Sequence, residues 1–324
     1  MKRLSTEMLT FTEIGGAGEM IYKAVRFPDY YWEFDHEIKE DVIVPVFSYT
    51  KRPTAGTDYS LTGLELLANL CNLYRKINNP DSSANITELV WDWCRNNIHP
   101  YYIDDLCDII ESADFKNPNI YERLRGDASF LVSKFVHDLS NLGSTFEYYD
   151  VLNKVYLEQD ASAGRKLYYE GRIRESIPLL EKYKQYTDDD EYIKQISAKY
   201  DSLMKGVITL FPAVKMNLKQ NNRTKKIEMG AEVHSVFDIA WYSFVRMVAT
   251  VAPPPDTNPD YMFSQSSILT CMACGDFFVR HSSRQRYCNN PDCQAERNNR
   301  KARAYYKRKK EYNPKLSGEK RSLL

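Results

Sequence analysis

Residues 271–310 read CMACGDFFVRHSSRQRYCNNPDCQAERNNRKARAYYKRKK. They hold four of the chain's seven cysteines, arranged as a C-x2-C pair and a C-x4-C pair with thirteen residues between the pairs. Two close pairs of thiolates at this spacing can complete a tetrahedral Zn²⁺ shell with Zn–S bonds of about 2.3 Å. The spacing therefore predicts one structural Zn²⁺ held by Cys271, Cys274, Cys288 and Cys293. The alternative, two disulfides, is disfavoured if the chain folds in a reducing compartment.

The residues between the cysteines predict a small finger. Gly275 follows the second cysteine, where a tight turn favours a residue that tolerates positive φ. Residues 277–279 are typical of a strand, and residues 286–287 are expected to form the strand that returns to Cys288. Cys293 is expected in the first turn of a helix, which completes a treble-clef-like layout. His281 is a further candidate ligand, although four cysteines already fill the shell.

A basic segment follows the last cysteine. Between Arg297 and Lys310 the chain has eight Lys and Arg residues and no Asp or Glu. A helix of this composition repels itself unless an anion lies nearby, so the segment predicts nucleic-acid binding, with DNA favoured over RNA. Tyr305 and Tyr306 interrupt the run and could pack on the finger or stack on bases. The candidate contact residues are Arg284, Arg286, Arg297, Arg300, Lys301, Arg303, Lys307, Arg308, Lys309 and Lys310.

The charge of the chain is divided between its two ends. Residues 1–279 contain 30 Lys and Arg against 40 Asp and Glu, whereas residues 280–324 contain 14 against 4. The whole chain is formally neutral. An acidic body with a basic tail suits an anionic partner at one end. Two alternatives stay open: the basic segment is a solvated face, or it docks on the acidic body of its own chain.

The C-terminal segment resembles the CGNR-type zinc finger of ABATE-domain proteins, a group regarded as transcription regulators. The family's Cys-Gly-Asn-Arg hallmark is replaced here by Cys-Gln-Ala-Glu-Arg at residues 293–297. The resemblance covers about 40 residues and implies a zinc finger with a nucleic-acid role. The matching features are Cys274-Gly275, Phe278, Arg286-Tyr287-Cys288, Cys293 and the Arg300-Lys301-Ala302-Arg303 run.

The first 252 residues are expected to form one α+β domain that is mainly helical. Residues 1–60 are rich in β-prone segments, with a glycine cluster at 15–18 that favours a hairpin turn. Pro45 interrupts the run at 41–50 and predicts an edge strand or a bulge. Residues 61–252 are expected to be the helical body. The proline-rich residues 253–266 are expected to be a linker that few contacts cross, and residues 267–324 the finger and its basic helix.

Hydrophobic periodicity locates the helices of the body. Cys71, Cys94 and Cys107 lie singly in these segments and are expected to be buried small hydrophobes. The acidic run at 188–191 is expected to begin a helix, and residues 215–226 are expected to form a loop or an exposed hairpin. The expected helices cover residues 61–77, 86–97, a segment from Pro100 through Ile110, 120–139, 188–207 and 235–250.

The sequence favours a binding protein over an enzyme. It contains no Gly-x-Ser-x-Gly, no Walker loop and no His-Glu-x-x-His, so no catalytic residues are assigned. A second interpretation is a protein-interaction adaptor, whose helical body binds a protein or small ligand while the finger is structural. A third is a zinc-scaffolded nuclease that uses His281 with Asn298 or Asn299.

The N-terminal residues and the apolar segments bear on localisation. Residues 1–7 lack the apolar region of a signal peptide. The most apolar stretch, residues 236–252, contains Asp238 and Arg246 and is too short for a membrane span. A cytoplasmic protein without a membrane partner is therefore expected.

Overall fold

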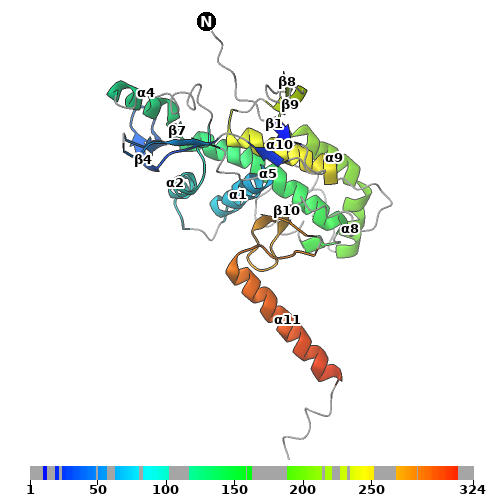
Figure 1. The fold of residues 1–324 in the computed structure, drawn as a ribbon. Coiled ribbons are helices and arrows are strands. Elements are labelled where there is room, and N and C mark those ends of the chain that lie inside the picture. The colour runs from blue at the N-terminus through cyan, green and yellow to red at the C-terminus, as the bar shows by residue number, and fades with distance from the viewer. Residues whose placement is uncertain are drawn as a thin grey trace, which may run out of the picture.

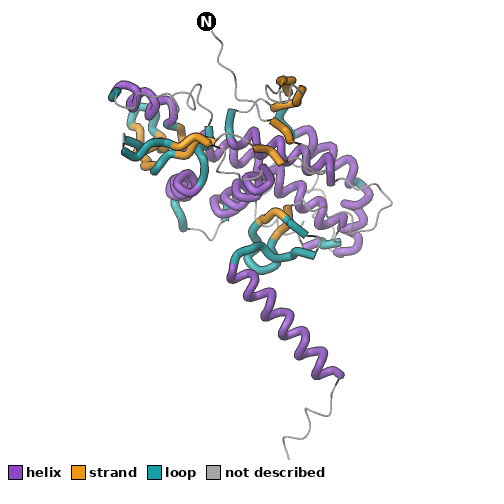
Figure 2. The backbone as a smooth tube through the Cα atoms, in the orientation of Figure 1, coloured by secondary structure: helices purple, strands orange, loops and turns teal. Residues whose placement is uncertain are grey.

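The computed structural model describes most of the chain. The protein is mainly helical, with small sheets near the N-terminus and a cysteine cluster near the C-terminus (Figures 1 and 2). The described residues are 10–12, 19–21, 24–48, 50–56, 63–79, 83–101, 117–157, 159–162, 188–213, 216–220, 227–231, 234–251, 268–282 and 284–312. The expected linker at 253–266 and the expected helix after Pro100, with Cys107, lie outside them.

Short antiparallel strands make up the N-terminal part. A three-stranded sheet has the order β4 (Asp29–Asp35), β5 (Glu40–Val46) and β7 (Phe130–Leu131). Two further pairs are β1 (Thr10–Thr12) with β2 (Glu19–Ile21) and β3 (Ala24–Arg26) with β6 (Thr54–Gly56). β1 and β2 flank the glycine cluster and pair antiparallel, as the hairpin prediction requires.

Pro45 has no backbone N–H to donate, and it lies at a position of β5 that pairs with β4 but not with β7. β5 is the middle strand of its sheet, but β7 is only two residues long and pairs with Val42 and Ile43 alone. Pro45 lies beyond that pairing and faces Tyr30 of β4. The strand is therefore an edge at Pro45, in agreement with the sequence-based expectation.

Four helices form the centre of the body: α1 (Gly63–Ile77), α2 (Ile86–Asn96), α5 (Val132–Leu157) and α10 (Val236–Val251). α1 packs against both α5 and α10 (Figure 1). The approach of α1 to α5 is close, because a Cβ added at Gly143 would lie 2.3 Å from Cγ of Tyr74. Cys71 and Cys94 are fully buried, as predicted for small hydrophobes.

The expectation of a single helix over residues 120–139 is wrong. The structure has α4 (Pro118–Ala128), then β7, then α5. The backbone N–H of Ser129 bonds the carbonyl of Gly126 and ends α4. Phe130 then pairs with Ile43 and buries its ring. Pairing with β5 therefore overrides a local pattern that continues in helical register.

A second, smaller core lies at the C-terminal half of α5. α8 (Asp189–Ala198) begins at Asp188, whose side chain accepts a hydrogen bond from the backbone N–H of Asp190, as the acidic run predicted. α9 (Tyr200–Thr209) follows after a break at Lys199. The expected apolar stripe is thus divided between two helices, and it packs on α5. β8 (Met216–Gln220) and β9 (Ile227–Ala231) form the hairpin expected near residues 215–226.

The finger is seated on the body, so the expectation of few contacts across the linker is wrong. β10 (Ile268–Thr270) and β11 (Phe277–Val279) lie against α1, and Ile268 and Phe277 belong to the main hydrophobic core. Their side chains are large apolar groups that a finger of this size cannot bury alone. Among the described helices, none combines the length and apolarity needed to cross a bilayer.

Candidate metal centre and basic surface

The finger starts with a two-stranded hairpin whose turn carries the first two cysteines. β10 and β11 pair antiparallel, with Thr270 opposite Phe277. The backbone N–H of Cys271 bonds the carbonyl of Asp276, and that of Gly275 bonds the carbonyl of Cys271. Gly275 has φ +81°, the left-handed conformation that the sequence predicted at this position.

The partner of β11 differs from the prediction. Residues 286–287 do not form the returning strand; β11 pairs with the segment before Cys271 instead. The later segment makes one backbone contact with the turn, from the N–H of Met272 to the carbonyl of Arg286. This bond still brings Cys288 next to the first pair of cysteines.

The four cysteines come together as predicted. Their sulfurs all lie within 4.8 Å of one another, and those of Cys274 and Cys288 are 3.9 Å apart. A tetrahedral shell with Zn–S bonds of about 2.3 Å places its sulfurs about 3.8 Å apart. Among the described residues, no other group of three or more metal-ligating side chains gathers in this way, and His281 is not part of this one. The residues therefore fit one metal ion with four thiolate ligands.

The backbone around the first cysteine favours its thiolate. The N–H of Cys288 points at Sγ of Cys271, 3.3 Å away. Burial raises the pKa of Cys271, but hydrogen bonds from the backbone N–H groups of Cys274, Cys288 and Ala273 outweigh this effect and lower the pKa to about 6. Burial raises the pKa of Cys293 to about 11. Ionising Cys293 near neutral pH therefore requires a bound cation.

The last cysteine belongs to a long helix, α11 (Pro291–Tyr312). Asn290 precedes it and accepts a hydrogen bond from the N–H of Asp292, which satisfies the first turn. Cys293 lies in that turn, as predicted, and is almost fully buried. Gln294 reaches back to the carbonyl of Cys288, 2.5 Å away. Cys293 and Gln294 thus connect the first turn of α11 to the other three cysteines.

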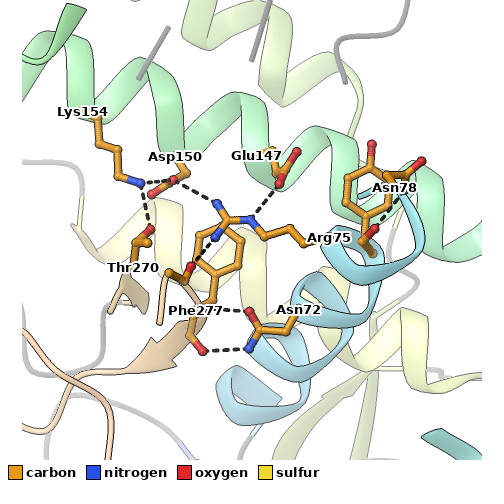
Figure 3. A network of polar contacts seen from close by, with 10 residues as sticks. Asn72, Arg75, Asn78, Glu147, Asp150, Lys154, Thr270 and Phe277 are labelled. Carbon is orange, nitrogen blue, oxygen red and sulfur yellow. Dashed lines mark hydrogen bonds and ion pairs between the residues drawn. The ribbon is translucent and has the colours of Figure 1, made fainter. Parts of the chain in front are cut away.

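Side chains of the body hold the finger at residues next to its cysteines (Figure 3). Asn72 pairs with both backbone groups of Phe277, at 2.9 and 2.7 Å. Arg75 donates to the carbonyl of Gly275 and lies over the ring of Phe277, 3.5 Å from its centroid. Lys154 donates to Oγ1 of Thr270, the residue before Cys271, at 2.7 Å. The body therefore contacts the chain on both sides of the first cysteine pair.

Ion pairs connect these contacts to α5 (Figure 3). Nε of Arg75 lies 2.7 Å from the carboxylate of Glu147, and Nζ of Lys154 lies 2.6 Å from that of Asp150. Glu147 is 2% exposed. Sequence reasoning missed these residues. They lie far from the cysteines in the chain, and nothing in their local pattern marks them.

The basic residues near the cluster converge from two segments. A hollow of about 590 Å³ lies between the loop after β11 and the start of α11. Tyr287 and Ala304 form its apolar surface, and the described residues that line it include no Asp or Glu. Its basic lining residues are Arg284, Arg286, Arg297, Arg300 and Lys301.

The remaining candidate residues extend along α11. The helix projects away from the body (Figure 1), and residues 301–309 are all exposed. Arg303, Lys307, Arg308 and Lys309 lie on this part and do not line the hollow. The side chain of Lys310 is not among those described. The described part of the basic segment is therefore not docked on the acidic body.

One acid is close to the basic hollow. The carboxylate of Glu296 lies 2.7 Å from Nε of Arg300, one turn along α11. This hydrogen bond lowers the pKa of Glu296 and raises that of Arg300. Arg300 is exposed and Glu296 is only half-buried, so the pair orients Arg300 beside Tyr287 and contributes little to stability.

Comparison with known proteins gives no relative for this chain: no family model, no curated protein and no solved structure matches it.

Proposed function

We propose that this protein binds nucleic acid through a zinc-stabilised finger and the helix that the finger anchors. The observation that supports this most is the hollow in which five Arg and Lys side chains meet, with no acid among its described lining residues. Glu296 pairs with Arg300, but the lining keeps an excess of positive charge, which is unfavourable unless a further anion offsets it. A phosphate backbone supplies regularly spaced negative charge, and Arg matches phosphate oxygens with two parallel hydrogen bonds.

We assign Zn²⁺ as the metal, because four thiolates in a tetrahedral arrangement are the usual ligand set of structural zinc. The ion would stabilise the turn and fix the first turn of α11. A shell of four protein ligands leaves no position for water or substrate. We therefore propose a binding role for the finger, in place of the nuclease alternative.

The resemblance to CGNR-type fingers supports the same proposal. It rests on the cysteines and on the basic run that follows them, and in that family it implies a transcription-regulator role. DNA is accordingly the first ligand to test, followed by RNA. The helical body would then carry a sensor or interaction function.

The experiment measures binding of the zinc-loaded full chain to labelled DNA and RNA at several salt concentrations. Each neutralised phosphate on duplex DNA contributes about −0.9 to the slope of log K against log salt, so roughly four contacts give a slope near −3.6. Replacing Arg297 and Lys301 by Gln should flatten this slope by about 2. If the zinc-loaded chain ignores DNA and RNA at low salt, the proposal is wrong.

A matched control separates the hollow from general positive charge. Lys309 lies on α11 but does not line the hollow. Lys309→Gln removes the same charge as Lys301→Gln from the same helix. The proposal requires Lys301→Gln to weaken binding more than Lys309→Gln does, with equal zinc content in both variants.

A second candidate is the adaptor function, which a specific groove favours. A groove of about 540 Å³ lies between α1, α2 and β11, and Asn69, Asn72 and Trp93 are among its lining residues. Its position at the junction of body and finger suits a protein or small ligand. This candidate would replace the first if the zinc-loaded chain binds no nucleic acid.

A further inference from the structure

A second hollow adjoins the basic one and has a different chemistry. Its volume is about 390 Å³. The two hollows share Arg284, Arg286, Tyr287 and Arg297. The rest of the second hollow consists of residues with amide, hydroxyl or imidazole side chains: His281, Ser282, Gln285, Asn289 and Gln294. Phosphate-binding groups and groups that can hydrogen-bond a base edge are thus side by side.

Hydrogen bonds within the loop hold the wall of the second hollow in place. Oε1 of Gln285 accepts from the backbone N–H of His281 at 2.9 Å, and its Nε2 donates to the carbonyl of Tyr287 at 3.2 Å. Oε1 of Gln294 accepts from Arg297 at 3.0 Å. These two amides position the loop. His281, Ser282 and Asn289 are the exposed residues of the wall. Oδ1 of Asn289 accepts from Nε2 of Gln285 at 3.3 Å, which leaves the amide Nδ2 of Asn289 facing a ligand together with the imidazole of His281.

We propose that the two hollows together form a site for one unpaired nucleotide of a single-stranded nucleic acid. This inference rests on the proposed function and narrows it from nucleic acid in general to single strands. The phosphates would lie in the basic hollow and the base in the polar one, where His281 and Asn289 would contact its edge. Both volumes are in the range of small-ligand sites, about 300–1,000 Å³.

The polar hollow adjoins the basic one, and this arrangement is the reason for choosing a single strand. Bases in a duplex are stacked and flanked by two backbones, and they enter a pocket only after being unpaired. A helix that reads the major groove needs polar side chains between its phosphate contacts. On α11 the residues that line the basic hollow are Arg297, Arg300, Lys301 and Ala304, which suit phosphates. The amides of Asn298 and Asn299 lie on the same helix but do not line this hollow.

Two exposed tyrosines on α11 point to the same ligand. Tyr305 and Tyr306 are 58% and 68% exposed, and their rings are 5.7 Å apart. Tyr305 follows Lys301 by one helical turn, so it lies next to the basic hollow along the helix. Single-strand-binding proteins combine a basic groove with aromatic side chains on which successive bases stack. The tyrosines would hold the base that follows the one in the polar hollow.

The test compares four ligands on the zinc-loaded full chain at one salt concentration: a single-stranded oligonucleotide, its duplex, an abasic strand of equal length and a mononucleotide. DNA and RNA versions of the strand are both used. The single strand should bind about tenfold tighter than the duplex and the abasic strand. The mononucleotide should compete only weakly, because it offers one phosphate site and no stacking neighbour. If a mononucleotide displaces the single strand completely when both are at the same concentration, the assignment of a single strand as the ligand is wrong.

Variants separate base contacts from phosphate contacts. His281→Ala with Asn289→Ala should reduce single-strand affinity to the abasic level and leave the salt slope unchanged. Tyr305→Ala should lower single-strand affinity several-fold, and Tyr305→Phe should retain it, because the phenyl ring still stacks. Since Asn289 is next to a cysteine ligand, each variant is compared at equal zinc content. Tyr305 is exposed on α11, so its pair of variants tests the site without disturbing the finger.

The outcomes distinguish this inference from the function on which it rests. If intact and abasic strands bind alike, or the duplex binds as tightly as the single strand, the unpaired-nucleotide site is wrong while nucleic-acid binding stands. If no nucleic acid binds, the proposed function itself is wrong.

Discussion

Arg75 of α1 donates a hydrogen bond of 2.7 Å to the carbonyl of Gly275, the residue that follows Cys274 of the four-cysteine site. The same guanidinium pairs with Glu147 of α5 and lies over the ring of Phe277 (Figure 3). One side chain thus joins two body helices to the turn that holds the metal. Because this turn carries two of the four cysteines, binding of a metal there would be thermodynamically linked to the stability of the body.

The first prediction is that zinc stabilises the body as well as the finger. All four tryptophans, Trp32, Trp91, Trp93 and Trp241, precede the finger, so their fluorescence reports on the body alone. Free zinc at a hundredfold excess over its Kd should add about 2.7 kcal/mol to the unfolding free energy. The tryptophan-detected melting temperature should therefore rise by roughly 5–10 °C. An unchanged melting temperature would show that the finger folds independently of the body.

The second prediction concerns the buried ion pair. Arg75→Ala removes the guanidinium partner of Glu147, which is 2% exposed, and should cost roughly 3–5 kcal/mol in urea unfolding. Adding Glu147→Gln should recover part of this loss, because no buried charge remains. Arg95→Ala is the matched control. Its pair with Asp29 has a similar length, 2.8 Å, but both side chains are more than 40% exposed, so it should cost less than about 1 kcal/mol. Equal losses in the two single variants would contradict the role given to burial.

The third prediction is that the body depends on Phe277. Its ring is 3% exposed and meets Phe146 edge-on at 4.9 Å. Phe277→Ala should destabilise the full chain by roughly 3–5 kcal/mol. Phe34→Ala, at a position that is 49% exposed, should change stability by about 0.5 kcal/mol or less. A chain truncated after residue 254 lacks Phe277 altogether, so it should melt at a lower temperature. A truncated chain that melts like the intact protein would contradict this prediction.

The sequence predicted the metal site well because that signal is local. Cysteine spacing and the positive φ of Gly275 are short-range requirements, and the sulfurs of Cys274 and Cys288 meet as expected. Strand pairing is not local. Residues 277–279 were predicted as a strand, but their partner is the segment before Cys271, because Ile268 and Phe277 must both reach the body core.

Tertiary contacts explain the other differences. Arg75 and Gly275 are 200 residues apart, and an Arg on an amphipathic helix gives no sign that it will bind a distant carbonyl. Phe130 fits a helical stripe by sequence, but its pairing with Ile43 makes it part of a sheet. In the same way, the run of basic residues was visible in the sequence, whereas the hollow depends on how the loop at 284–287 folds against α11.

The last prediction is a pH dependence that originates at His99. This imidazole is 6% exposed, lies 3.2 Å from the hydroxyl of Tyr30, and packs edge-on against Phe27. Burial lowers its pKa from 6.5 to about 3, so the folded protein disfavours the protonated form. The stability that neutral His99 contributes is complete above pH 6.5 and is lost as the pH falls toward 3, because the unfolded chain takes up the proton first.

At pH 5 this loss amounts to about 2 kcal/mol. His99→Gln keeps a hydrogen-bonding side chain and cannot titrate, so its unfolding free energy should fall by about 2 kcal/mol less than that of the natural chain between pH 7 and pH 5. Urea unfolding at the two pH values measures both proteins. Zinc release and the titration of other groups affect the natural chain and His99→Gln equally. The test is therefore the difference between their losses of unfolding free energy. If His99→Gln and the natural chain lose the same free energy, the fold does not lower the pKa of His99 and the prediction is wrong.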